Sequence, residues 1–205
     1  MRMPAAENKQ SYRIKGSKFY GYLKPCVSVS NFESQLDSIR SEYPDATHHC
    51  YAYRINPVRL KEFDQDDGEP GGTAGKPILN KMRSAELVNA TLVVVRYFGG
   101  TKLGISGLIE AYGHTAELCI QSAKLQQIRL IKKFQITYPY PEQNIIEKLR
   151  NRWKLVEVDA TYLEKATLTL GCPVDQADAF ESELKQQTAW REFDYRVMGK
   201  DFCEN

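Results

Sequence analysis

The chain has 205 residues, of which 42% are hydrophobic and 26% are charged, and its net charge at neutral pH is +2. This balance is that of an ordinary globular protein, and the length allows one large domain or two small ones. The small net charge neither favours nor excludes a polyanionic partner. The densest apolar stretch, Leu92–Val95, is far shorter than the ~18 residues of a membrane-spanning helix.

The N-terminus and the cysteines indicate where the protein resides. The first residues, MRMPAAENKQ, contain no apolar segment typical of a signal peptide. The five cysteines are scattered and form no C-x-x-C pair, which is typical of free thiols in a reducing compartment. We therefore expect a soluble, cytoplasmic protein that does not associate with membranes.

Strands and helices alternate in the first half of the chain. Residues 11–24 predict two short strands. Apolar side chains in residues 29–42 recur at intervals of four and three, which predicts an amphipathic helix. Residues 49–55 predict a strand, and the acidic residues 62–69 predict a short strand that leads into a loop.

A dense run of glycines in residues 68–75 precedes a predicted short helix at residues 76–83. Residues 90–98 are apolar and mostly β-branched, as in a central strand that is buried on both faces. Two glycines end this strand, and residues 103–124 predict a second helix. The expected buried face of this helix comprises Ile105, Leu108, Tyr112, Ala116, Cys119 and Ala123.

The pattern restarts near residue 129. Its predicted elements follow the order β-α-β-β-α-β, which is the split βαβ, ferredoxin-like plan. We therefore predict an α+β protein with two domains, residues 1–128 and residues 129–205. The strands of the second domain are expected at residues 131–138, 155–162, 166–170 and 193–198, with helices opening after Pro139 and at Asp175, a plausible N-cap.

The first candidate site is the loop Asp66–Pro77, with the sequence DDGEPGGTAGKP. Its glycines allow backbone N–H groups to converge, and a helix N-terminus behind such a loop attracts anions. Thr73 is a candidate N-cap for this helix. The spacing departs from the P-loop of nucleotide triphosphatases, so the alternative is a tight loop with helix caps. The residues expected to bind an anion are Gly72, Thr73, Gly75 and Lys76.

The second candidate site links the apolar strand to the helix that follows it. Its glycines again precede a helix N-terminus, its basic residues supply charge, and its two aromatic rings supply stacking faces. The pattern does not match the G-x-G-x-x-G of dinucleotide-binding folds. The alternative is a strand end with core aromatics. The candidate residues are Arg96, Tyr97, Phe98, Gly99, Gly100, Thr101 and Lys102.

The third group combines His48 and His49 with the acidic residues Asp66, Asp67 and Glu69. These are metal-ligand types, but adjacent residues on a strand point to opposite faces, and no metal-binding spacing accompanies them. Acidic residues of a turn tend instead to bond backbone N–H groups. We therefore retain these five as ligand-binding candidates and predict no metal, no cofactor and no catalytic residue.

The chain resembles the Impact/YigZ family in three blocks: His48-His49-Cys50, Asp66–Pro77 and Val94–Gly104 (VVRYFGGTKLG). The resemblance covers about residues 12–125. It implies a first domain similar to the second domain of ribosomal protein S5, and a second domain similar to a ferredoxin-like module of elongation factor G. It also implies a role in translation, because eukaryotic Impact proteins regulate translation during amino-acid starvation, by competing for a scaffold that activates an initiation-factor kinase.

These observations together predict a non-catalytic, translation-associated protein that binds RNA or the ribosome through its glycine-rich loops. Basic residues Lys76, Arg96 and Lys102 would contact phosphates, and Tyr97 or Phe98 a base. The two loops should then lie side by side. Two alternatives stay open: a metal-assisted hydrolase that uses Asp66, Asp67, Glu69 and a histidine, and a protein-interaction module that binds a translation-control protein. The oligomeric state is not predicted.

Overall fold

Two antiparallel sheets and five helices form a two-domain α+β fold in the computed structural model, which describes residues 1–204. The first unit spans Met1–Ile128, and the second begins at Arg129. No helix among the described residues is long and apolar enough to cross a membrane.

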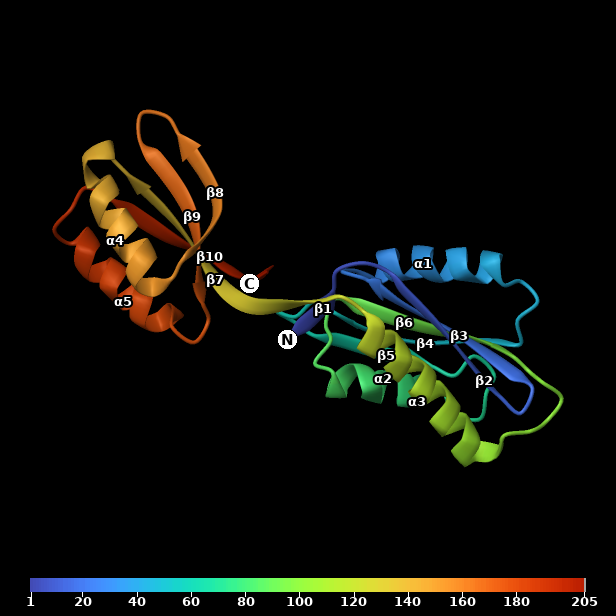
Figure 1. Cartoon of the computed structure of the whole chain (residues 1–205). Coiled ribbons are helices and arrows are strands. Elements are labelled where there is room, and N and C mark those ends of the chain that lie inside the picture. The colour runs from blue at the N-terminus through green and yellow to red at the C-terminus, as the bar shows by residue number, and fades with distance from the viewer. Residues whose placement is uncertain (205) are drawn as a thin grey trace. The chain divides into compact units, whose positions relative to one another are not determined.

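The first unit is a five-stranded sheet in the order β2-β3-β6-β4-β5, with every neighbouring pair antiparallel. Helix α1 covers one face of this sheet, and α2 and α3 cover the other (Figure 1). Its elements are β1 (Arg2–Pro4), β2 (Asn8–Ile14), β3 (Ser17–Pro25), α1 (Val29–Glu42), β4 (His48–Ile55), β5 (Lys61–Gln65), α2 (Gly75–Ser84), β6 (Ala90–Tyr97) and α3 (Gly104–Ser122).

Strand β6 lies at the centre of this sheet and separates two apolar cores. Leu92 and Val94 pack toward α2 and α3, whereas Val93 and Val95 pack toward α1. All four side chains are fully buried, which confirms the prediction of a strand buried on both faces. Burial of this β-branched run therefore fixes the position of Arg96, the next residue along the chain.

The predicted buried face of α3 is correct except at its two ends, because Ala123 is the half-buried C-cap beyond the helix. Leu108, Tyr112 and Cys119 are buried, but 65% of Ile105 is exposed. The helix begins at Gly104, so Ile105 lies in its first turn, before the part of the helix that packs on the sheet. The sequence pattern also gave no indication of β1, which pairs with residues 125–127 in the register Arg2–Gln127 to Pro4–Leu125.

The second unit has the predicted β-α-β-β-α-β order. Strand β7 pairs with both β9 and β10, and β9 pairs with β8, which is the ferredoxin-like arrangement. Asp175 is not the N-cap of the second helix, because one further turn residue intervenes and Gln176 takes that position. The elements are β7 (Leu125–Tyr138), whose first four residues belong to the first unit, η1 (Tyr140–Glu142), α4 (Gln143–Trp153), β8 (Val156–Tyr162), β9 (Ala166–Pro173), α5 (Ala177–Thr188) and β10 (Asp194–Glu204).

The tight turn between β2 and β3 packs against the loop that follows β6. Lys15 and Gly16 both have positive φ angles, 45° and 80°, as in the two-residue type I′ turn that suits a hairpin. Gly99 lies so close to this turn that a Cβ atom on it would be 1.9 Å from the Gly16 carbonyl carbon. Only a glycine at position 99 leaves room for the turn.

Gly99→Ala should therefore destabilise the first unit, by about 1–3 kcal/mol for overpacking. Thermal unfolding monitored by circular dichroism would measure the loss. Gly71→Ala is the matched control, because Gly71 has no atom within 4 Å of its Cβ position and no positive φ. Equal melting temperatures for the two variants would show that the close contact between the turn and Gly99 is not required.

Candidate functional site

The side chain of Asp66 organises the first glycine-rich loop. Its Oδ2 accepts a hydrogen bond from the Gly72 N–H at 2.7 Å, and its Oδ1 accepts from the N–H groups of Ala74 and Gly75, each at 2.9 Å. These donors surround the N-terminus of α2, where an anion is favoured. The N–H groups at which the glycines were predicted to hold an anion are thus bonded by a carboxylate of the chain itself.

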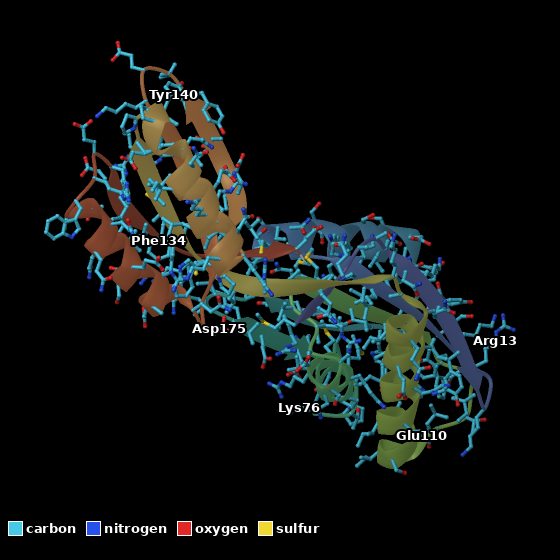
Figure 2. The ribbon with its side chains drawn as sticks, turned by 60° about the vertical axis from the view of Figure 1, so that its left-hand side comes forward. Arg13, Lys76, Glu110, Phe134, Tyr140 and Asp175 are labelled. Atoms are coloured by element: carbon cyan, nitrogen blue, oxygen red, sulfur yellow. The ribbon has the colours of Figure 1, made fainter. Side chains whose placement is uncertain are left out.

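The other predicted residues of this loop have roles that differ from those expected. Ala74, not Thr73, is the N-cap of α2, and the Thr73 hydroxyl donates instead to the Pro70 carbonyl at 2.7 Å. Lys76 is exposed in the first turn of α2, well apart from Arg13 near the β2–β3 turn (Figure 2). Thr73 is not needed as a cap, because the Asp66 carboxylate accepts from the N-terminal donors of the helix.

A buried ion pair joins the two glycine-rich loops. Oε1 of Glu69 accepts hydrogen bonds from Nη1 of Arg96 at 2.5 Å and from the Tyr112 hydroxyl at 2.7 Å. The side chains of Glu69 and Arg96 are 4% and 5% exposed. The predicted adjacency of the two loops is confirmed. The predicted contact between Arg96 and a phosphate does not suit this geometry, because Glu69 already neutralises the guanidinium.

The two histidines point to opposite faces of β4, as expected from their alternation. Nδ1 of His48 lies 2.7 Å from the Asp67 carbonyl oxygen, and its Nε2 lies 3.8 Å from the Glu69 carboxylate. His49 is buried on the other face, and burial lowers its pKa. Its backbone N–H donates to Oδ2 of Asp67 at 2.7 Å. Asp66 and Asp67 thus both bond backbone N–H groups, which confirms that prediction.

The acidic and imidazole groups do not assemble into a metal-binding cluster. Within residues 1–204, no group of three or more His, Cys, Asp or Glu side chains is placed to hold a metal ion. The carboxylates of Asp66 and Glu69 are directed at N–H groups and at Arg96. A hydrolase mechanism through these residues would first have to break the contacts that shape the loop.

The β2–β3 turn supplies a third part of the site that the sequence pattern did not reveal. The Ser17 hydroxyl oxygen accepts from the Gly99 N–H at 3.2 Å and lies 3.4 Å from Nη2 of Arg96. The Phe98 N–H donates to the Thr47 hydroxyl at 3.1 Å. We call the surface formed by residues 15–20, 43–47, 66–75 and 96–105 the loop face.

Two pockets open on the loop face, and Phe98 lines both of them. We call the pocket between the two glycine-rich loops the inter-loop pocket, and its volume is about 340 Å³. We call the pocket lined by three tyrosines the tyrosine pocket, and its volume is about 460 Å³. Gly100 and Thr101 are exposed and line neither pocket. The inter-loop pocket is lined by Glu69, Pro70, Arg96, Phe98, Lys102, Leu103, Gly104, Ile105 and Leu108. The tyrosine pocket is lined by Gly16, Lys18, Tyr20, Tyr43, Tyr97 and Phe98.

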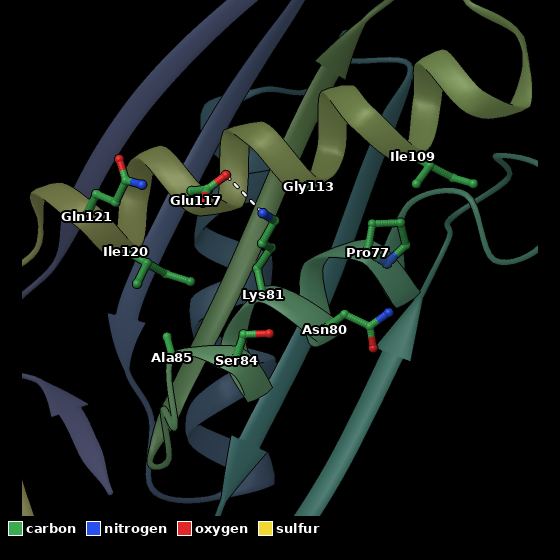
Figure 3. Close-up of a pocket in the computed structure, with 10 residues that line it drawn as sticks. All are labelled: Pro77, Asn80, Lys81, Ser84, Ala85, Ile109, Gly113, Glu117, Ile120 and Gln121. Carbon is green, nitrogen blue, oxygen red and sulfur yellow. Dashed lines mark hydrogen bonds and ion pairs between the residues drawn. The ribbon is translucent and has the colours of Figure 1, made fainter.

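A separate groove of about 430 Å³ runs between α2 and α3 (Figure 3). Lys81 on α2 reaches across it to Glu117 on α3, at 2.9 Å, and Ile109 and Pro77 lie toward one end. Of the candidate loops predicted from the sequence, only the last residue of the first, Pro77, lines this groove.

Asp66→Asn should destabilise the first glycine-rich loop, because an amide cannot accept from donors on both sides and loses the charge. The expected loss is about 1.5–3 kcal/mol, the range for hydrogen bonds to a charged group. Hydrogen exchange of the Gly72, Ala74 and Gly75 amides should become faster. Asp64→Asn on β5 is the control, since the hydrogen bonds of the loop within residues 1–204 do not involve Asp64. Unchanged exchange in Asp66→Asn would contradict the role given to this carboxylate.

The cysteines should be poor nucleophiles in the folded protein. Burial raises the pKa of the Cys119 thiol to about 12 and those of Cys26 and Cys172 to about 11, and it also raises that of Cys50. Only Cys203, which is half-buried, should react quickly with a thiol reagent at neutral pH. Titration should therefore count one fast thiol in the native protein and five after unfolding. Rapid reaction of Cys50 in the native state would contradict its protonated, buried character.

Residues 15–120 match the Impact N-terminal domain family. An IMPACT family member of Haemophilus influenzae is 31% identical to this chain over 185 residues, or 87% of each protein. The IMPACT family member YigZ of Escherichia coli is 31% identical over 184 residues, which are 89% of this chain and 90% of YigZ. A crystal structure described as that of a hypothetical protein is 28% identical and matches 96% of each chain with a TM-score of 0.65. The chain therefore belongs to the Impact family.

Proposed function

We propose that this chain is a non-catalytic, translation-associated protein of the cytoplasm that binds RNA or the ribosome through the loop face. One observation supports this most strongly: two adjoining pockets combine aromatic rings with the lysines Lys18 and Lys102. Single-stranded nucleic acids are bound without sequence preference by such combinations, in which bases stack on rings and phosphates contact lysines. The family resemblance supports the association with translation.

The aromatic side chains offer several faces for stacking. Tyr20 stacks on Tyr43, with ring centroids 5.5 Å apart and planes at 21°, and Tyr97 packs edge-on against both. Phe98 lies in a loop rather than in a core, and 47% of it is exposed. An unpaired base can therefore reach a ring on the loop face without displacing core side chains.

The acidic stretch of residues 62–69 does not oppose an RNA ligand, because its charges are mostly paired within the protein. Glu62 lies 2.6 Å from Arg54 and 2.5 Å from Arg83, and these hydrogen bonds hold its pKa below the usual range. Asp66 is held by backbone N–H groups, and Glu69 by Arg96. The lysines at the rims of the pockets are therefore the charges that an approaching phosphate meets.

The groove between α2 and α3 supports protein interaction as a second candidate function. It contains the exposed Ile109 and the half-buried Ile120 beside one ion pair, and it lies outside the loop face. A translation-control protein is the partner class that the family resemblance favours for it. We further assign the second unit to the ferredoxin-like module seen in elongation factor G, again on resemblance.

RNA binding should depend on salt and on the two lysines of the loop face. With about two phosphate contacts, the logarithm of affinity for single strands should fall with the logarithm of salt with a slope of roughly −1.4. Lys18→Ala or Lys102→Ala should weaken binding severalfold and reduce the slope by about 0.7. Fluorescence anisotropy with a labelled single-stranded RNA at several salt concentrations would measure both quantities.

Lys148→Ala is the matched control, because Lys148 is an exposed lysine on α4 in the second unit. It should leave both affinity and slope unchanged. If the three variants behave alike, or if the wild-type protein binds no RNA at low salt, the proposal is wrong, and the groove between α2 and α3 becomes the candidate site.

A further inference from the structure

Arg96, which lines the inter-loop pocket, carries a buried donor that lacks a partner. Nε of Arg96 is buried and makes no hydrogen bond within residues 1–204, whereas Nη1 and Nη2 contact Glu69 and Ser17. The guanidinium carbon lies 5.5 Å from the ring centroids of both Phe19 and Phe98, so the group is held in place. Buried donors are rarely left unpaired in native proteins, and an exception suggests an external acceptor.

The same pocket wall also offers an acceptor. The contacts of Glu69 with Arg96, Tyr112 and His48 all use Oε1, which leaves Oε2 of this carboxylate to accept a hydrogen bond. A free N–H and a free carboxylate oxygen therefore belong to one ion pair in one wall. A ligand that fits them presents both a hydrogen-bond acceptor and a hydrogen-bond donor.

The charge and the shape of the pocket further limit the kinds of ligand that it can bind. Because Glu69 neutralises Arg96, this ion pair offers a phosphate no net positive charge, so an uncharged group is favoured in the pocket. Much of the remaining wall is apolar and includes Leu103, Ile105 and Leu108. Lys102 is exposed at the mouth, where it can meet a phosphate. The volume of about 340 Å³ is in the range of small-ligand sites.

We propose that the inter-loop pocket binds one unpaired nucleobase. The base lies against Phe98 and the aliphatic wall, its acceptor receives the Arg96 Nε–H, its donor bonds Glu69, and Lys102 contacts the attached phosphate. Each of the four bases carries both a donor and an acceptor on its Watson–Crick edge, so this pocket holds a base without selecting a sequence. In the case of RNA this inference rests on the proposed function. A free nucleotide offers the same chemistry.

The test compares two short single strands: one with a single base flanked by abasic nucleotides, and one that is entirely abasic. The wild-type protein should bind the one-base strand roughly tenfold more tightly, as expected for one stacked and hydrogen-bonded base. Arg96→Lys preserves a cation for Glu69 but removes the Nε–H and the planar guanidinium, so this advantage should disappear. Lys102→Ala should weaken both strands equally.

A second variant keeps the test decisive if Arg96→Lys does not fold. Ile105→Trp places bulk at the exposed end of the pocket and should also abolish the advantage of the one-base strand. Ile109→Trp is its control, since Ile109 lies one turn further along α3, is 43% exposed and lines the other groove. An advantage that persists in Arg96→Lys and Ile105→Trp but is lost in Tyr20→Ala would place the base in the tyrosine pocket and overturn the inference.

Competition with a nucleoside monophosphate shows whether the pocket binds a base of RNA, a free nucleotide or both. If it displaces the one-base strand at comparable concentration, and only from proteins with an intact inter-loop pocket, the pocket binds free nucleotides as well. Binding of both strands with equal affinity would leave RNA binding standing and refute the base pocket. Binding of the monophosphate but of neither strand would refute the proposed function and retain the pocket, whereas no binding at all would refute both.

Discussion

The loop face depends on the buried ion pair between Glu69 and Arg96. Glu69 comes from the acidic loop, Arg96 from the end of β6, and the Tyr112 hydroxyl that joins them from α3. Burial raises the pKa of Tyr112, so its hydroxyl keeps the proton that it donates. Removing one charge of such a pair typically costs about 3–5 kcal/mol, because the other charge is left buried and unpaired. The pair therefore fixes the relative positions of three elements.

The glycines of the two loops serve backbone contact as much as ligand binding. Gly75 lies against the backbone of Gln65, where a Cβ atom would be 2.6 Å from the Gln65 nitrogen, and Gly99 lies against the β2–β3 turn. The N–H groups that glycines expose at the start of α2 are used by Asp66. A side chain of the protein itself can thus occupy the N–H groups of a glycine-rich loop before a helix. A ligand would then contact the outer surface of the loop.

The sequence predicted most elements, because strands and helices are specified by local patterns that burial reinforces. The run of residues 90–98 is the clearest case. The sequence did not predict contacts between distant segments, such as Asp66 with Gly75 or Ser17 with Gly99. These contacts depend on how the loops meet after the sheet has formed. Tyr20 and Tyr43 were missed for the same reason: they belong to β3 and to the end of α1, and only the folded sheet places them beside Tyr97.

The roles of individual charged residues were also hard to predict. Arg96 and Lys102 resemble each other in sequence as basic residues beside glycines, yet one is buried and neutralised and the other is exposed. The difference arises because β6 ends one residue beyond Arg96, so that its side chain still points into the core shared with α3, whereas Lys102 follows two loop glycines. Whether a basic side chain is available to a ligand therefore depends on whether the fold pairs it with an acidic side chain, and not on its residue type.

Ultraviolet crosslinking of the protein to single-stranded RNA, with the crosslinked residues mapped by mass spectrometry, tests binding at the loop face most directly. Aromatic rings that stack on bases crosslink efficiently, so the modified residues should be Tyr20, Tyr97 or Phe98. Crosslinks confined to α1 or to residues 129–204 would show that RNA binds elsewhere and would contradict the assignment of the loop face.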